Sequence, residues 1–341
     1  MSRVTTMQVG KLRVHALEAG IQHLDGGAMF GVVPKPLWEK RIAPDARNRI
    51  RLAMRTLLIE HDDGLVLVDS GLGNKETQKF LDIYGIENAG ADGRTALEDA
   101  LAELGHKPED VKVVVSTHLH FDHAGGNTFI APDDAERRVQ PTFANARYVA
   151  HRREYAYAAH ANERTTASYF PHNYAPLIES GQMQMIDGPA GTIVPGVRVM
   201  VTPGHTPWHM AVLLESAGEG LLFPADTVPT AHHLPLPWIM GYDVEPLRTL
   251  ESKRALYYRG MAEGWRVVFE HDADTVGGRM VSGEKGTELA ERMVARRRRR
   301  HDRRRLEEVG PAWCRQTCRG GVSAICSTTE RHPLDRGGPV H

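Results

Sequence analysis

Apolar and polar positions alternate along most of this chain in a pattern that predicts two sets of strands separated by helices. Apolar, often β-branched runs bounded by Gly, Pro or polar residues are typical of buried strands. The predicted strands lie near residues 12–18, 54–60, 65–69 and 111–116, and then near 197–202, 210–215, 220–224 and 266–270. Helical patterns lie near residues 74–83, 94–105, 151–170 and 246–262. The order of elements predicts an α/β protein in which two mixed sheets are flanked by helices, an αββα sandwich.

Two local features of the sequence concern the start of the last helix and a segment rich in Gly and Pro. Pro246 lies in the first turn of the helix near 246–262, and Asp243 is the residue that we expect to cap it. Residues 24–38 contain so many Gly and Pro residues that no regular element is expected there.

Length and composition favour one large domain with an appendage. The chain has 341 residues and a hydrophobic content of 41%, which is enough for a substantial core. The sequence changes character near residue 283, and two Arg-rich runs follow at Arg296–Arg300 and Arg303–Arg305. We therefore predict an α/β domain over residues 1–282 and a poorly ordered, Arg-rich tail over 283–341. Such a tail can bind nucleic acid, but a solvated appendage is the interpretation that we favour.

The chain shows no sign of membrane insertion or export. No apolar stretch reaches transmembrane length, and Met1–Thr6 lacks the apolar core of a signal peptide. The three cysteines, Cys314, Cys318 and Cys326, all lie in the tail, so no disulfide framework is expected in the core. The sequence therefore predicts a cytoplasmic protein without a membrane partner.

The strongest chemical signal is a cluster of metal-ligand side chains in residues 117–126. His118, His120, Asp122 and His123 lie within six residues and follow an apolar run, Val111–Val115. Imidazole and carboxylate groups are good ligands for borderline divalent cations. A loop at the carboxyl end of a strand is also where α/β enzymes usually place their chemistry.

The same pattern recurs three times downstream, because further apolar runs lead to His205, Asp226 and His271. Strands that deliver ligands to one sheet edge predict a paired-metal site. Paired metals are typical of hydrolytic enzymes.

The motifs HLHFDHAGG and GHTPWH, followed by a later Asp and a final His, resemble the metallo-β-lactamase superfamily over roughly residues 10–280. Within it, the chain is similar to the branch that includes N-acyl-homoserine lactonases and methyl parathion hydrolases. The resemblance implies the αββα sandwich of that family and two metal sites that share one carboxylate. The resemblance implies that one metal is held by His118, His120 and His205, and the other by Asp122, His123 and His271. Asp226 would bridge both metals, and Asp69 would support the ligands without binding a metal itself.

The ligand set also limits the choice of cofactor. Redox di-iron relatives carry a Glu where this chain has His120, and relatives with a Cys ligand are disfavoured because no cysteine precedes Cys314. We expect two divalent ions, with zinc favoured and Mn, Fe or Co also compatible. In such a site a metal-bridging hydroxide attacks the substrate, and Asp122 is expected to pass a proton to the leaving group.

Two positions depart from the family pattern. Trp208 replaces a glycine that family members often carry, and Pro229 stands where lactonases of this branch have a Tyr that hydrogen-bonds the substrate carbonyl. His232 or His233 is the predicted replacement donor, although both could be ordinary loop residues.

Aromatic and thioether side chains near the predicted site suggest an apolar substrate pocket. Loop packing is the alternative for the residues of segment 24–38. The predicted pocket residues are Met29, Phe30, Trp38, Trp208 and Trp238.

The favoured function is a metal-dependent hydrolase of a carboxylic ester or lactone. Alternatives are an organophosphate triesterase and a nucleic-acid processing or binding protein that uses the basic tail. Nuclease relatives carry a large insertion that is missing between Asp226 and His271, so a nucleic-acid partner is disfavoured. The expected partner is a small molecule with an apolar part, and a homodimer is also considered.

Overall fold

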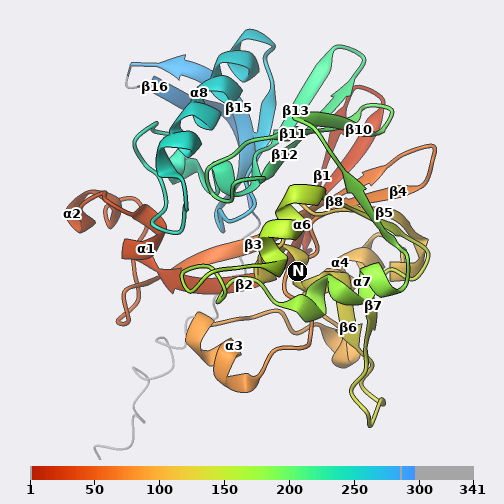
Figure 1. Cartoon of the computed structure of the whole chain (residues 1–341). Coiled ribbons are helices and arrows are strands. Elements are labelled where there is room, and N and C mark those ends of the chain that lie inside the picture. The colour runs from red at the N-terminus through yellow and green to blue at the C-terminus, as the bar shows by residue number, and fades with distance from the viewer. Residues whose placement is uncertain (1, 285, 296–341) are drawn as a thin grey trace, which may run out of the picture. The chain divides into compact units, whose positions relative to one another are not determined.

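The computed structural model describes residues 2–284 and 286–295, which form two facing seven-stranded sheets (Figure 1). In spatial order, the first sheet contains β1 (Val4–Val9), β2 (Leu12–Asp25), β3 (Arg49–Glu60), β4 (Leu65–Val68), β5 (Val111–Val115), β8 (Arg147–His151) and β9 (Met183–Ile186). The second contains β10 (Ala190–Val194), β11 (Val197–Val201), β12 (Met210–Ser216), β13 (Glu219–Phe223), β14 (Arg266–Val268), β15 (Thr275–Gly283) and β16 (Gly286–Val294). A small separate pair is formed by β6 (Thr128–Ile130) and β7 (Val139–Pro141).

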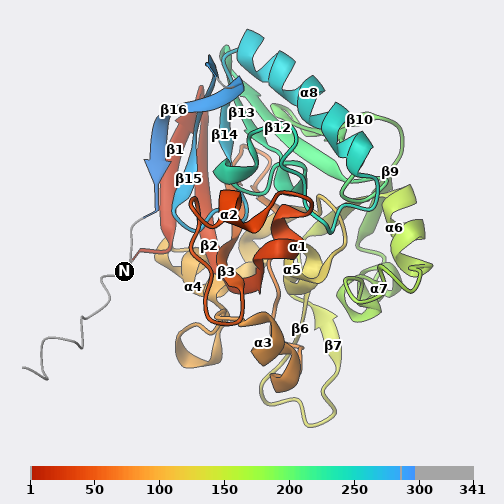
Figure 2. The same ribbon diagram turned by 90° about the vertical axis from the view of Figure 1, so that its left-hand side faces the viewer.

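Helices cover the outer faces of both sheets, as the apolar periodicity predicts. On the first sheet, α4 (Ala96–Glu103) buries Leu97 and Leu101 against the strands. On the second, α8 (Pro246–Ala262) lies across the outer face of the strands (Figure 2). This helix packs Leu256 and Tyr257 beside Trp265. The other helices are α1 (Gly26–Phe30), α2 (Lys35–Trp38), α3 (Gln78–Tyr84), α5 (Phe121–Ala124), α6 (Arg152–Ala159) and α7 (Ala175–Glu179). The predicted αββα sandwich is confirmed.

The main core lies between the two sheets and consists largely of β-branched side chains. Val14, Val66 and Val113 from the first sheet belong to the same buried cluster as Val212 and Phe223 from the second. Branched side chains pack well on a pleated surface, and burying each one contributes roughly 1.5–3 kcal/mol. This core holds the two sheets against each other and thereby fixes the position of the edge at which their loops meet.

The strand directions bring the ligand-bearing loops to that edge. In the first sheet, β4, β5 and β8 run parallel, so the segments that follow β4 and β5 leave the sheet on the same side. In the second sheet, β13 and β14 are parallel and lead to Asp226 and His271. Carboxyl ends of parallel strands share an edge, which is why distant parts of the chain converge here.

Two predicted local features are corrected by the structure. Segment 24–38 contains two short helices, α1 and α2, because Asp25 accepts a hydrogen bond from Ala28 N–H and Pro36 suits the first turn of α2. The predicted helix over 151–170 is limited to α6, and a loop follows it.

The predicted boundary between residues 282 and 283 is also wrong. β15 runs to Gly283, and β16 pairs with it in antiparallel register, with Met280 opposite Leu289. Leu289 packs into the same cluster as Trp265, so this hairpin completes the second sheet. Its strand pattern was missed because most of the side chains of β16 are polar or exposed. The rest of the predicted tail, from residue 296, lies outside the described residues.

Within the described part of the chain, no helix is long and apolar enough to cross a membrane.

Candidate active site

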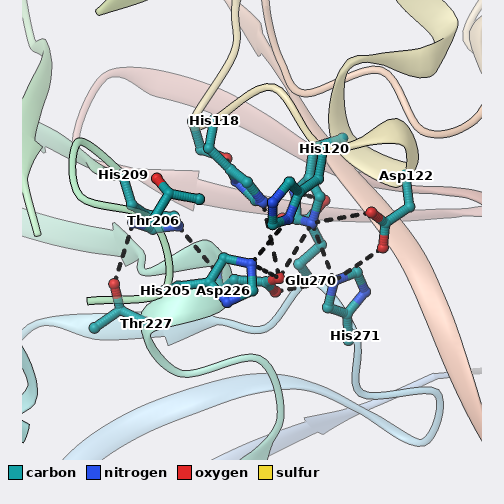
Figure 3. A network of polar contacts seen from close by, with 12 residues as sticks. His118, His120, Asp122, His205, Thr206, His209, Asp226, Thr227, Glu270 and His271 are labelled. Carbon is teal, nitrogen blue, oxygen red and sulfur yellow. Dashed lines mark hydrogen bonds and ion pairs between the residues drawn. The ribbon is translucent and has the colours of Figure 1, made fainter. Parts of the chain in front are cut away.

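The seven predicted ligands converge in two neighbouring groups. All of them except His123 are labelled in Figure 3. In each group, one ligand atom per residue lies within 4.8 Å of the ligand atoms of the others. All seven side chains are buried. The first group is His118, His120, His205 and Asp226, and the second is Asp122, His123 and His271.

The first loop gathers four of these side chains because a short helix begins inside it. His120 precedes α5, and its carbonyl accepts hydrogen bonds from the N–H groups of His123 and Ala124 at 3.1 and 2.9 Å. This turn places Asp122 and His123 in α5 while His118 and His120 remain in the preceding loop. The loop then passes so close to Ser70 that a Cβ on Gly126 would lie 2.1 Å from the Ser70 carbonyl oxygen. A glycine is therefore required there.

The Asp226 carboxylate lies between the two groups. Its Oδ2 is 3.0 Å from His205 Nε2 and 3.4 Å from His123 Nε2, and its Oδ1 is 2.9 Å from His271 Nε2. The backbone N–H of Asp226 donates to His209 Nε2 at 3.2 Å, so this buried imidazole fixes the loop that carries Asp226. In this position, the Asp226 carboxylate could coordinate two cations, one with each oxygen.

The donor set fits divalent cations better than it fits hydrogen bonding alone. His118 Nε2 is buried and has no hydrogen-bond partner, and Asp226 Oδ1 lacks one with good geometry despite its short distance to His271. Ring nitrogens also approach each other closely, with His205 Nε2 3.0 Å from His120 Nδ1 and His271 Nε2 3.2 Å from His123 Nε2. Buried polar atoms without partners are rare in proteins, and convergent imidazole and carboxylate atoms are typical metal ligands.

The charges in the site support this interpretation. Burial, with help from neighbouring imidazoles, lowers the pKa values of His118 and His120 well below the usual histidine value, which favours the neutral ligand form. For His205, burial is outweighed by Asp226 and Asp243, which raise its pKa to about 10. For His271, burial is likewise outweighed by Asp226, and the pKa rises to about 9. Without a cation, these carboxylates hold protons on the two imidazoles, so protons and cations compete for the same nitrogens.

Two buried carboxylates face the Nδ1 atom of His123. Asp69, the predicted support, lies 3.2 Å away and also accepts hydrogen bonds from the N–H and hydroxyl of Thr117 at 2.8 and 2.7 Å. Glu270 lies closer, at 2.9 Å, and burial raises its pKa to about 8. Sequence reasoning missed Glu270, although a charged residue directly after the buried run 267–269 was a usable signal. Carboxylates behind a ligating histidine fix its ring orientation.

Asp243 supports His205 in the same way. Its Oδ1 lies 2.9 Å from His205 Nδ1, and its Oδ2 accepts a hydrogen bond from the Thr249 hydroxyl at 2.7 Å. The expected helix cap is therefore corrected: the residue before α8 is Glu245, and no side chain caps this helix end. The Asp243 carboxylate is used to orient a ligand instead.

Replacing Asp243 with Ala should weaken metal binding by roughly 10- to 100-fold, because such partners hold the ligand ring in its binding orientation. Competition with a chromophoric chelator would measure this change. Glu245→Gln is the matched control, because Glu245 is only two residues away and pairs with exposed Arg248. Equal affinity in the two variants would show that Asp243 does not support the ligand.

Glu154, on α6, connects the two ligand-bearing loops. Its buried carboxylate accepts hydrogen bonds from Thr206 Oγ1 at 2.7 Å, Tyr169 Oη at 2.9 Å and Leu119 N at 3.3 Å. The ring of Tyr169 also packs edge-on against His120, with 4.6 Å between centroids. Glu154 gave no signal in the sequence, because it lies in no recognisable motif and its partners are distant in sequence.

A cavity of about 330 Å³ opens onto the ligands. Of the predicted pocket residues, only Met29 lines it. Residues that the sequence analysis missed make up most of the lining: Leu24, Ala28, Tyr84, Phe121, Arg164, Thr165, Ser168, Met240, Gly241, Tyr242 and Val244.

The other predicted pocket residues pack elsewhere. Phe30 and Trp38 are only 1% exposed and stack on each other in the core cluster that also contains Met29. Trp238 packs edge-on against Phe30. Trp208 stacks on His151, with ring centroids 5.1 Å apart, and Arg153 covers it. The bulky ring of Trp208 therefore lies outside the cavity, and the pocket prediction is wrong for these four side chains.

The predicted replacement donors are also wrong. Both ring nitrogens of His233 are used, because Nε2 donates to the Met29 carbonyl and Nδ1 accepts from the Thr230 hydroxyl, each at 2.8 Å. His232 does not line the cavity. Lys253 holds the segment between His233 and Trp238 by donating to its carbonyl groups. These histidines are loop residues, the alternative that the sequence left open.

The fold and the ligand cluster define the class of protein, a metal-dependent hydrolase, and comparisons with known proteins give the family. The model of the metallo-beta-lactamase superfamily matches residues 55–258. The chain belongs to this superfamily.

Relatives of known sequence or structure agree with this assignment. An N-acyl homoserine lactonase of Bacillus cereus is 30% identical over 238 residues, which cover 67% of this chain and 84% of that protein. The solved structure of a probable metal-dependent hydrolase from Staphylococcus aureus is 29% identical with a TM-score of 0.74, and the match covers 84% of this chain and 100% of that one. An N-acyl homoserine lactone hydrolase, solved with its product at the catalytic metal center, is 25% identical with a TM-score of 0.57, covering 78% and 94% of the two chains.

Proposed function

We propose that this protein is a dinuclear metal-dependent hydrolase of carboxylic esters or lactones, and that N-acyl homoserine lactones are its first substrate class to test. The observation that carries the proposal is the position of Asp226, whose two oxygens face imidazoles of both ligand groups at 2.9–3.4 Å. The similarity to the Bacillus cereus lactonase over 84% of that protein supports the choice of substrate class.

The chain offers one set of ligands to each cation. His118, His120 and His205 would hold one cation, and Asp122, His123 and His271 the other, with Asp226 shared. Nitrogen and carboxylate donors without cysteine suit zinc, which we propose as the metal. When bound, such cations lower the pKa of water and polarise a carbonyl oxygen.

Asp122 is the side chain best placed to move a proton. It lines the cavity, and Gln22 Nε2 donates to its Oδ2 at 2.6 Å, which fixes the orientation of the carboxylate. A carboxylate held beside the reacting atoms can carry a proton to the departing oxygen of an ester. We therefore assign Asp122 both roles, ligand and proton carrier.

The cavity also explains why water is the proposed nucleophile. Ser168 is the single serine in the lining among the described residues, and its side chain makes no hydrogen bond to a histidine there. A serine nucleophile normally needs such a base. The apolar side chains of the lining, such as Met29, Phe121, Met240 and Val244, would contact the acyl part of the substrate.

The test is a substrate panel run on metal-loaded protein. N-acyl homoserine lactones, aryl esters, aryl phosphotriesters and single-stranded DNA would be compared, with chelator-treated protein as the control. The proposal expects metal-dependent hydrolysis of a lactone or ester at the highest kcat/KM. A clear preference for the phosphotriester or for DNA would instead support one of the alternatives, and no ester or lactone hydrolysis would contradict the proposal.

A further inference from the structure

The loop after Asp226 has no hydroxyl group available to a substrate. Pro229 carries none, and its carbonyl accepts a hydrogen bond from His271 N–H at 2.9 Å. Nearby hydroxyl groups are already bonded, Thr227 to Thr202 at 3.0 Å and Thr230 to His233 at 2.8 Å. If a hydroxyl binds the scissile group in this protein, it must come from another element of the cavity.

Four cavity-lining residues carry hydroxyls: Tyr84, Thr165, Ser168 and Tyr242. Thr165 Oγ1 already donates to Asn162 at 3.3 Å. Among the described residues, no hydrogen-bond partner is found for the hydroxyls of Tyr84, Ser168 and Tyr242. A phenol is the stronger hydrogen-bond donor of these groups, since its pKa is near 10, and it reaches further into a cavity than serine.

Tyr84 is held more firmly than Tyr242. Its ring packs against Phe80 and Phe121, with centroid distances of 4.5 and 5.2 Å, while Tyr242 is 38% exposed. Phe121 immediately precedes the ligand Asp122, so the ring of Tyr84 rests directly on the ligand-bearing helix α5. A donor fixed in advance loses less entropy when it binds the transition state.

The backbone around Tyr84 is fixed to the same part of β2 that orients Asp122. Tyr84 ends α3, which lies near β2 in both ribbon views (Figures 1 and 2), and the carbonyl of Gly85 accepts a hydrogen bond from His23 Nδ1 at 2.9 Å. Glu87 then forms a two-bond bridge with Ile21, at 3.0 and 2.8 Å. Gln22, between these two anchor points, donates to Asp122. One rigid segment thus places both the phenol and the carboxylate.

From this arrangement we infer that Tyr84 is a catalytic residue whose hydroxyl donates a hydrogen bond to the oxygen of the scissile carbonyl, in place of a donor from the loop after Asp226. The inference rests on the proposed function. It further implies a substrate whose carbonyl enters between α3 and α5, with its apolar part against Met29 and Met240. Burial, assisted by the charge of Asp122, raises the pKa of Tyr84, so the phenol keeps its proton and remains a donor.

The test compares Tyr84→Phe with Tyr258→Phe in the metal-loaded full-length protein. Tyr258 is 78% exposed on α8 and serves as the matched control. Loss of an oxyanion donor should lower kcat roughly 100-fold while KM changes little, because the bond strengthens as charge develops on the oxygen. Metal content should be equal in both variants. Unchanged kcat in Tyr84→Phe, or a large loss only in Tyr242→Phe or Ser168→Ala, would overturn the inference.

A binding measurement separates failure of this inference from failure of the proposed function. Calorimetry with a ring-opened N-acyl homoserine, whose carboxylate presents a charged oxygen, should show about tenfold weaker binding to Tyr84→Phe than to Tyr258→Phe. Equal binding would contradict the role of Tyr84 even if the wild-type protein is active. A wild type that binds this compound more tightly than Tyr84→Phe does but hydrolyses no lactone or ester would contradict only the proposed function. If the wild type hydrolyses only aryl esters, the carboxylate product of that ester takes the place of this compound.

Discussion

Asp226→Ala is expected to lower kcat/KM by at least ~10³-fold, which corresponds to about 4 kcal/mol of transition-state stabilisation. The reason is that one carboxylate faces both ligand groups, at 3.0 Å from His205 Nε2 and 2.9 Å from His271 Nε2. On the proposed function, its removal would take a ligand from each cation and would also remove the negative charge that offsets their repulsion. Metal content by elemental analysis and lactone hydrolysis would be measured on the same preparation.

The control for Asp226→Ala is Asp187→Ala, which removes a carboxylate from an exposed ion pair with Arg152. This control should keep both metal content and activity. If Asp226→Ala retained two cations and full turnover, the shared-carboxylate geometry would have no functional meaning and the proposal would fail.

Glu154→Ala is expected to lower the free energy of unfolding by about 3 kcal/mol, because three buried donors lose their acceptor and each unsatisfied donor costs about 1–3 kcal/mol. These donors are the Thr206 and Tyr169 hydroxyls and the Leu119 N–H. The loops carrying His120 and His205 would lose their connection, so metal affinity should fall as well. Chemical denaturation would be measured with and without metal, since bound cations add stability of their own.

Glu163→Ala provides the comparison, because Glu163 lies on an exposed loop near the end of the same helix. A Glu154→Ala variant whose metal-free stability matched that of Glu163→Ala would contradict the structural role. Glu154→Gln should be intermediate, since its amide oxygen can still accept some of the hydrogen bonds.

The seven side chains that converge at the candidate site could be predicted as a group because their signal is local. Each one follows a strand whose apolar pattern is readable, and four of them lie between His118 and His123. The parallel arrangement of strands then brings the ends of these segments together, so no knowledge of packing was needed. The fold could be predicted for the same reason, since the strands that form the inter-sheet core have clear apolar runs.

The cavity could not be predicted because its lining depends on which loops meet. Phe30 and Trp38 were predicted to line the pocket, yet they stack on each other in the core. Tyr84 and Tyr242, which do line the cavity, come from segments far apart in the sequence. The sequence did not predict the supporting role of Glu154, Asp243 and Glu270. Each carboxylate lies near its partner in space but far from it in the sequence, so no motif or spacing identifies it. The strand β16 was missed because an edge strand with many polar side chains has little apolar alternation.

The central claim is that two cations share Asp226 in the active protein. The most direct test combines two measurements. Elemental analysis gives the metal content of purified, fully active protein, and titration of metal-free protein with metal is followed by lactone hydrolysis. The account predicts two equivalents of divalent metal per chain and maximal activity only when the second equivalent has bound. Full activity with a single equivalent, or with none, would contradict it.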